Sequence, residues 1–252
     1  MVALRVSEKK KKNGLVSIIN QEQTLQLDVS TEPRSDKMSI RVLRVTPEKI
    51  KEVPVTSRDV GSYSKAEALI LDPSLQYIEI GAGLGGFIPA VVNSQQGYGP
   101  KPIVIDPCDY HSLYEMMNRA LHLDISDQMR SRLDFHIERC KVYLSDNVVL
   151  LNMWLGDAIR RPDLVGIADI VVDNLAALLY GDPHTGFDNG FEAGRQQVED
   201  WEKLMLKENG LLITEYDVIY KKDGVFLPGY AISQFCPQRS KRGPIRWGNT
   251  LG

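Results

Sequence analysis

The stretch that decides the fold reads YIEIGAGLGGF and runs from Tyr77 to Phe87. It opens with four mostly apolar residues, as expected of a buried strand, and includes one acid, Glu79. Three glycines follow at every second position: Gly81, Gly83 and Gly85. Such glycines allow the backbone to turn tightly and to approach a ligand closely. Because a helical pattern then begins, the stretch predicts a strand, a turn that cradles a nucleotide-like ligand, and a helix.

Outward from this stretch, apolar strand-like runs alternate with helical patterns. Helices are expected at residues 64–71, 110–121, 126–140 and 191–208, and strands at residues 103–106, 147–154, 168–174 and 211–215. Two short apolar runs around Asp223-Gly224 predict a hairpin. Alternating buried strands and helices are typical of an α/β protein with a doubly wound, mainly parallel sheet. In such a sheet the ligand lies at the carboxyl ends of the strands.

The chain before this α/β region has a different pattern. Residues 1–12 are basic and are expected to be mobile, and short β-like runs at 15–19, 24–27 and 40–45 predict a small β-rich extension over residues 13–56. The α/β domain is expected over residues 57–238, followed by a basic tail at 239–252. The extension would cover a sheet edge or mediate homo-oligomer formation. The alternative is a flap over the substrate.

Composition places the chain among soluble globular proteins, with 43% hydrophobic and 25% charged residues in 252. No apolar run is long enough to cross a bilayer, and no secretory signal is evident, so no membrane partner is expected. The three cysteines, Cys108, Cys140 and Cys236, have no paired spacing. They are expected to be reduced thiols of a cytoplasmic protein, with neither a disulfide nor a metal site.

The net charge of −3 is unevenly distributed. Both ends of the chain are basic, so the body between them is more acidic than the whole. A broad nucleic-acid surface would require a basic face, so an acidic body argues against one. The basic ends are expected to be solvated tails. In the alternative, the C-terminal tail gathers an anionic substrate.

The glycines alone leave the ligand open. Gly81, Gly83 and Gly86 match the dinucleotide fingerprint, whereas Gly81, Gly83 and Gly85 match the pattern seen with S-adenosylmethionine. Glu79 favours the second ligand, because a carboxylate beside the turn repels a diphosphate and attracts an ammonium or a sulfonium. Asp106 ends the next strand, where a carboxylate can accept ribose hydroxyls of either ligand.

A third acid lies in Gly156-Asp157-Ala158, after the third strand of the sheet. There an aspartate can accept the exocyclic amine of adenine while backbone N–H groups meet the ring. The dinucleotide fingerprint has no place for this acid. Each acid also has a structural interpretation. Glu79 could tie down loop backbone, and Asp106 and Asp157 could each cap a following helix.

Over about residues 60–227, the chain resembles class I S-adenosylmethionine-dependent methyltransferases. The resemblance is carried by the glycine turn with Glu79, by Asp106 and by Gly156-Asp157-Ala158, in this order. The resemblance implies a Rossmann-like, seven-stranded, mainly parallel sheet that ends in an antiparallel hairpin. It implies that the turn from Gly81 through Ala82 and Gly83 to Gly85 holds the methionine portion and that Glu79 orients the amino group. It further implies ribose binding by Asp106, adenine binding by Gly156, Asp157 and Ala158, and packing of Pro107 or Cys108 on the adenosine.

The methyl acceptor is expected to meet the segment after the fourth strand. Asp173 and Asn174 lie where they could bind an acceptor or the cofactor. The segment lacks the Pro-Pro-aromatic sequence of the amino-methylating nucleic-acid enzymes, and this argues against a nucleic-acid acceptor. His184 lies in a glycine-rich loop and could act as a general base, since histidine ordinarily titrates near neutrality. The alternative is a solvated loop histidine.

The sequence thus favours a methyltransferase that uses S-adenosylmethionine and acts on an oxygen or nitrogen atom of a small molecule. Three alternatives stay open: an RNA or protein methyltransferase that uses the basic tail, an NAD-dependent oxidoreductase, and a binding protein without turnover.

Overall fold

The computed structural model describes residues 6–11, 14–32, 39–45, 50–54, 72–173, 182, 184–185, 191–214 and 218–228. The chain divides into two units. One unit contains Met1–Ser57 and Cys108–Ser145, and the other contains Arg58–Pro107 and Asp146–Gly252. Among the described residues, no helix combines the length and the apolar character that a membrane span requires.

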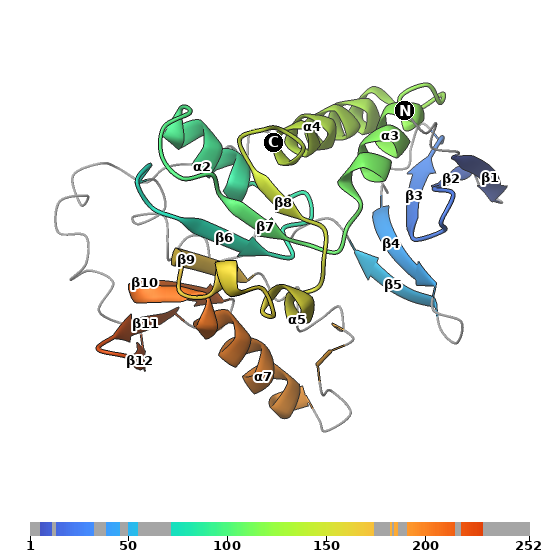
Figure 1. Ribbon diagram of the computed structural model, residues 1–252. Coiled ribbons are helices and arrows are strands. Elements are labelled where there is room, and N and C mark those ends of the chain that lie inside the picture. The colour runs from blue at the N-terminus through green and yellow to red at the C-terminus, as the bar shows by residue number, and fades with distance from the viewer. Residues whose placement is uncertain are drawn as a thin grey trace. The chain divides into compact units, whose positions relative to one another are not determined.

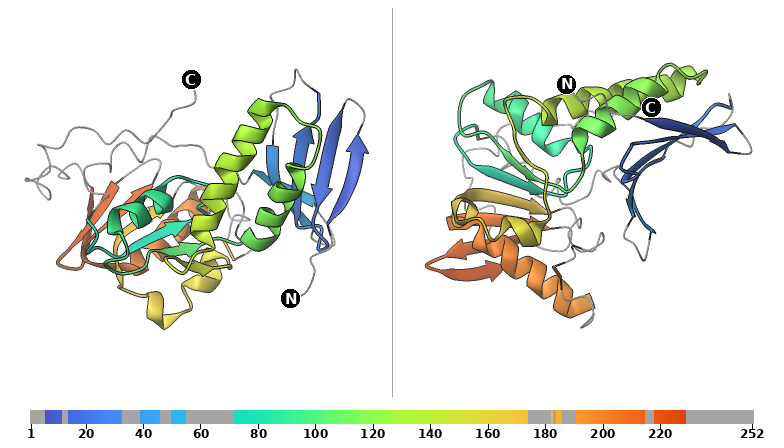
Figure 2. Two further views of the ribbon diagram at one scale, coloured as in Figure 1. Left: turned by 90° about the horizontal axis from the view of Figure 1, so that it is seen from above. Right: turned by 45° about the vertical axis from the view of Figure 1, so that its right-hand side comes forward.

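The first unit contains a five-stranded antiparallel sheet in the order β1-β2-β3-β4-β5, visible as blue arrows in Figure 1 and Figure 2. Its strands are β1 (Ser7–Lys11), β2 (Leu15–Ile19), β3 (Leu25–Ser30), β4 (Ser39–Val45) and β5 (Ile50–Pro54). The three β-like runs expected here are confirmed as β2, β3 and β4. Residues 7–11, which were expected to be mobile, instead pair with β2.

The two faces of β2 and β3 differ in chemistry. On one face Val16 lies opposite Val29 in the strand register, and all the hydrophobic side chains on this face are buried. On the other face the Ser17 hydroxyl donates to the Asp28 carboxylate at 2.6 Å. This alternation is the expected period of a strand whose two faces meet different surroundings.

Two helices complete the first unit, α3 (Tyr110–Ala120) and α4 (Asp127–Tyr143). The side chain of Asp109 accepts the Ser112 N–H at 3.1 Å and caps α3, and the Ser126 hydroxyl caps α4. Helix α3 packs on β2 and β3. Both helices confirm the predicted helical segments. Their grouping with the first sheet differs from the expected division, which assigned them to the α/β domain.

The second unit contains a seven-stranded sheet in the order β12-β11-β10-β9-β6-β7-β8. The strands are β6 (Tyr77–Ile80), β7 (Ile103–Ile105), β8 (Val149–Leu151), β9 (Ala168–Asp173), β10 (Leu206–Thr214), β11 (Val218–Lys222) and β12 (Val225–Pro228). Strands β8, β7, β6, β9 and β10 are parallel, and β11 and β12 form the predicted antiparallel hairpin. The expected doubly wound, mainly parallel sheet is confirmed.

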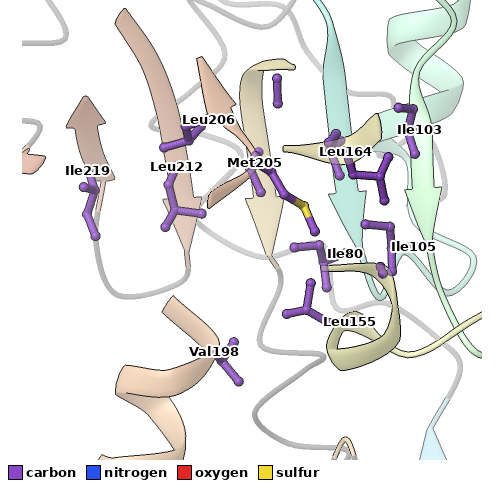
Figure 3. Packing of buried hydrophobic residues seen from close by; sticks show 14 residues of the cluster. Ile80, Ile103, Ile105, Leu155, Leu164, Val198, Met205, Leu206, Leu212 and Ile219 are labelled. Carbon is purple, nitrogen blue, oxygen red and sulfur yellow. The ribbon is translucent and has the colours of Figure 1, made fainter. Parts of the chain in front are cut away.

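The helices of this unit are α2 (Phe87–Gln95), the short α5 (Leu155–Ala158), a 3₁₀ turn at Pro162–Leu164, and α7 (Phe191–Leu204). A buried cluster lies between α5, α7 and the sheet. In Figure 3, Leu155 of α5 and Val198 of α7 lie with Ile80 and Leu212 of the sheet in this cluster. The helices α5 and α7 are therefore held against the sheet by apolar packing.

Two element boundaries differ from those expected. Helix α7 ends at Leu204 and not at residue 208, because the buried residues Met205 and Leu206 lead directly into β10. Asn209, with φ of 65°, lies in an irregular part of that strand. The expected strand 147–154 shortens to β8, because Trp154 already caps α5. The helix expected at 64–71 lies outside the described residues.

The strand order reverses beside β6. Strand β6 lies between β7 and β9, and the chain leaves it toward one side of the sheet first and the other side later (Figure 1). In open α/β sheets, ligands bind outside the carboxyl ends of the strands at such a reversal point. The turn after β6 is therefore the expected location of a ligand.

Candidate functional site

The glycine turn follows β6 directly. Gly81 and Gly83 have φ of 62° and 53°, in the left-handed region that favours glycine. The Gly81 N–H donates to the Ile105 carbonyl at 2.8 Å, and the Gly85 N–H donates to the Ala82 carbonyl at 2.9 Å. The backbone then enters α2 at Phe87. The predicted sequence of strand, tight turn and helix is confirmed.

Asp106 lies beside this turn. Its Oδ2 atom accepts the Gly83 N–H at 2.8 Å, and the side chain is almost fully buried. The parallel pairing of β6 and β7 brings the two segments together although they are far apart in sequence. The helix-cap interpretation of Asp106 is wrong, because Asp109 caps α3. Pro107, the next residue, is exposed, and Cys108 is buried.

Glu79 lies within β6, opposite Val104 of β7 and Val172 of β9, and has 0% exposure. Its neighbours Ile78 and Ile80 belong to the apolar cluster, so Glu79 faces the other side of the sheet. A carboxylate is rarely placed in a central strand without a compensating charge or hydrogen bonds. Together with Asp106, it gives the neighbourhood of the turn a negative character.

A carboxyl pair lies at the end of β9. Asp173 is the last residue of β9 and pairs in register with Ile80 of β6 and with Thr214 of β10. Its side chain is hydrogen-bonded to Glu202 of α7, and both residues are nearly fully buried. Burial raises the pKa of Glu202 well above its usual range, and the carboxylates of Asp173 and Glu199 raise it further.

Sequence reasoning missed Glu202. The signal that could have found it is its spacing, because Val198, Glu202 and Met205 lie four and three residues apart on one helical face. An acid on the apolar stripe of a helix is rarely buried without a partner. Asn174, which was predicted beside Asp173, lies outside the described residues.

Asp157 lies inside α5 and contacts His184. The Asp157 Oδ1 atom lies 2.9 Å from His184 Nε2 and 3.3 Å from Arg160 Nη1. Among the described residues, no donor contacts its second oxygen, and the side chain is 42% exposed. The helix-cap interpretation of Asp157 is wrong, because α5 begins two residues earlier after Trp154.

The contact between Asp157 and His184 is held by Asp182. The Asp182 carboxylate accepts the Gly156 N–H at 2.7 Å and the His184 N–H at 2.9 Å. The loop comes so close to α5 that a Cβ added at Gly156 would lie 2.5 Å from the His184 Cβ. The Gly156 N–H, expected to meet adenine, therefore binds a carboxylate. The N–H groups of Asp157 and Ala158 both donate to the Trp154 carbonyl.

The structure thus brings the predicted residues into two groups. One group surrounds the turn at the reversal point and contains Glu79, Gly81, Gly83, Asp106 and Asp173. The other lies on α5 and contains Gly156, Asp157 and His184. Within the described ranges, no group of three or more His, Cys, Asp or Glu side chains is arranged to hold a metal ion.

Comparison with known proteins adds little. No family model and no curated protein matches the sequence. Among solved structures, the chain is similar to a SAM-dependent methyltransferase from Aquifex aeolicus, at 13% identity over 73% of this chain and 80% of that chain. The TM-score of this match is 0.36. A likeness this distant supports no functional inference, so function has to be argued from the residues of the site.

Proposed function

We propose that this chain is an S-adenosylmethionine-dependent methyltransferase that acts on an oxygen or nitrogen atom of a small molecule. The observation that carries the proposal is the pair of buried acids beside the glycine turn. Glu79 and Asp106 lie at the turn where the strand order reverses. Carboxylates at this position oppose a diphosphate and favour a ligand with an ammonium and a sulfonium group.

The described residues fit the methionine and ribose portions of this ligand better than they fit its adenine. The left-handed turn offers the close backbone approach that the methionine portion requires, and the Asp106 carboxylate lies beside the turn, where it could accept the ribose hydroxyls. On α5, the second oxygen of Asp157 can accept the adenine amine. The Gly156 N–H already donates to Asp182, so a contact from it would require the loop at His184 to move, and the Asp157 N–H donates to the Trp154 carbonyl of α5.

When bound, S-adenosylmethionine supplies a methyl group on a positively charged sulfur. The chain has to align the acceptor with that methyl, and alignment supplies most of the acceleration in reactions of this type. A hydroxyl or ammonium acceptor must also lose a proton. Asp173, Asn174 and His184 are the proposed residues for gripping the acceptor or taking this proton. Asp157 would orient the His184 ring through its contact with Nε2.

A binding experiment tests the donor. Thermal-shift and calorimetric titrations with S-adenosylhomocysteine and with NAD compare the two ligands that the glycine pattern allows. Binding of S-adenosylhomocysteine without binding of NAD supports the proposal, and the reverse result would establish an oxidoreductase instead.

A transfer experiment tests the acceptor. The protein is incubated with methyl-labelled S-adenosylmethionine and a cell extract separated into metabolites, RNA and protein. Label in the metabolite fraction supports the proposed small-molecule acceptor. Label in RNA or protein would favour the alternative that uses the basic tail, and cofactor binding without any transfer would indicate a binding protein.

A further inference from the structure

The carboxyl pair at the end of β9 lies beside the proposed cofactor turn. Asp173 is the register partner of Ile80, and Gly81 is the next residue of the chain. Glu202 reaches Asp173 from α7, and the two residues are 2% and 1% exposed. Two carboxyl groups in contact and away from water cannot both carry a charge, so they share a proton. Burial and the neighbouring carboxylates raise the pKa of Glu202, which favours Glu202 as the holder of this proton and as the donor to the Asp173 carboxylate.

The charges around Glu202 come from three elements. Its own helix contributes Glu199 and Lys203, which pair with each other at 2.6 Å. Strand β10 and helix α5 pack against α7. On these two elements, Lys207 pairs with Asp169, and Asp157 contacts His184 and Arg160. The Glu202 Oε1 atom is buried and has no hydrogen-bond partner in the described part of the chain.

We propose that the Asp173–Glu202 pair couples binding of the cationic cofactor to release of a proton. The inference rests on the proposed function, since it requires a sulfonium near the turn. When the cation binds, the O–H bond of Glu202 breaks, the proton passes to solvent, and both carboxylates are stabilised by the positive ligand. When the methyl group leaves, the sulfur becomes neutral, and the pair takes one proton back.

The physical basis is the response of a carboxyl group to a nearby cation. An opposite charge within about 4–6 Å lowers the pKa of a carboxyl group by about 1–3. S-adenosylmethionine and S-adenosylhomocysteine both carry an ammonium and a carboxylate and differ by the charge on sulfur. The pair would therefore favour the methylated donor over the product, which would assist product release after transfer.

Calorimetry measures the proton directly. Titrations of S-adenosylmethionine and of S-adenosylhomocysteine at pH 7, in buffers with different ionisation enthalpies, report the number of protons released on binding. We expect more protons to be released with S-adenosylmethionine than with S-adenosylhomocysteine. Since binding and proton release are linked, the ratio of the two affinities should rise with pH, by up to about tenfold per pH unit.

Two variants locate the proton. Glu202→Gln keeps the shape of the side chain but holds no titrating proton, so the difference between the two ligands should disappear. Asp200→Asn is the matched control, because Asp200 is an acid of the same helix whose side chain is 60% exposed. The control should release protons as the unmodified protein does. If Glu202→Gln does not fold, the comparison of the two ligands with the unmodified protein still tests the coupling, since equal proton release would overturn it.

Each outcome has one meaning. Equal proton release with the two ligands would overturn the coupling and leave the proposed function standing. An unchanged difference in Glu202→Gln would place the proton elsewhere and also overturn it. Failure of both ligands to bind would contradict the proposed function and, with it, the proposed coupling.

Discussion

Asp106 holds the glycine turn, and in the proposed function it also binds the ribose. Because its Oδ2 atom holds the Gly83 N–H, replacement by alanine would loosen the turn and remove a ligand contact together. Asp106→Asn separates these effects, since the amide oxygen can still accept the Gly83 N–H while the charge is lost. We expect S-adenosylhomocysteine to bind about 1–3 kcal/mol more weakly, with a nearly unchanged melting temperature. Calorimetry and thermal unfolding measure both quantities, and normal binding by this variant would exclude Asp106 from the site.

Gly156 is the point at which the His184 loop meets α5. Gly156→Ala would place a Cβ 2.5 Å from the His184 Cβ, an approach that real side chains do not make. The loop must shift, so we expect a loss of about 1–3 kcal/mol in the free energy of unfolding, the usual range for overpacking. Chemical denaturation measures it.

The double variant Gly156→Ala with His184→Gly is the control for this prediction. It removes every His184 atom that the new methyl group would meet, so part of the lost stability should return. If the single variant is as stable as the unmodified protein, the loop does not pack on α5 as described.

At the scale of elements, α4 carries a buried histidine. Burial, together with the charges of Arg139 and Arg132, lowers the pKa of His136 from 6.5 to about 4. The folded state therefore holds His136 neutral, and its contribution to stability is present above pH 6.5 and lost as the pH falls toward 4. The shift corresponds to about 3 kcal/mol.

His136→Leu tests this contribution, because the leucine does not titrate and the His136 Nδ1 atom has no hydrogen-bond partner among the described residues. We expect the difference in unfolding free energy between pH 7 and pH 4 to shrink by about 3 kcal/mol in the variant. Urea denaturation at the two pH values measures it. An unchanged pH dependence would show that the histidine is charged in the folded state.

Elements near the turn could be predicted because local signals suffice for them. Gly81 and Gly83 form the tight turn that their spacing suggested, and α4 covers most of the segment 126–140 in which a helix was predicted. The contact between Asp157 and His184 could not be predicted, because it depends on a loop that returns to α5 from 26 residues away. Periodicity reports which face is buried and leaves the partner open.

At the scale of the whole molecule, periodicity also leaves open which surface covers α3. This is why α3 was expected in the α/β domain. Its apolar face was visible in the sequence, but the surface that covers it belongs to β2 and β3, about eighty residues earlier. The expected division placed this helix with the α/β domain, whereas its contacts group it with β2 and β3. The seven-stranded sheet was easier to predict, because buried parallel strands read as continuous apolar runs.

Removal of residues 1–57 tests whether α3 belongs to the same unit as the N-terminal sheet. Since α3 packs on β2 and β3, the truncated protein would expose buried side chains of α3 such as Leu113 and Met117. We expect stronger binding of a hydrophobic dye, a lower melting temperature and aggregation in size-exclusion chromatography. Removal of residues 1–5 alone is the control, because β1 begins only at Ser7. A truncated protein that stays monomeric with the original melting temperature would contradict the grouping.

The division of the first unit into two chain segments has a consequence for synthesis. The strands β1–β5 leave the ribosome well before residues 108–145, whose helix α3 packs on them. At about 5–20 residues per second, the nascent sheet waits several seconds for its helix. During that time β2 and β3 lack this cover, and the turn after β6 is made in the same interval. A chaperone that binds β2 and β3 during this interval would therefore protect the nascent sheet until α3 is made.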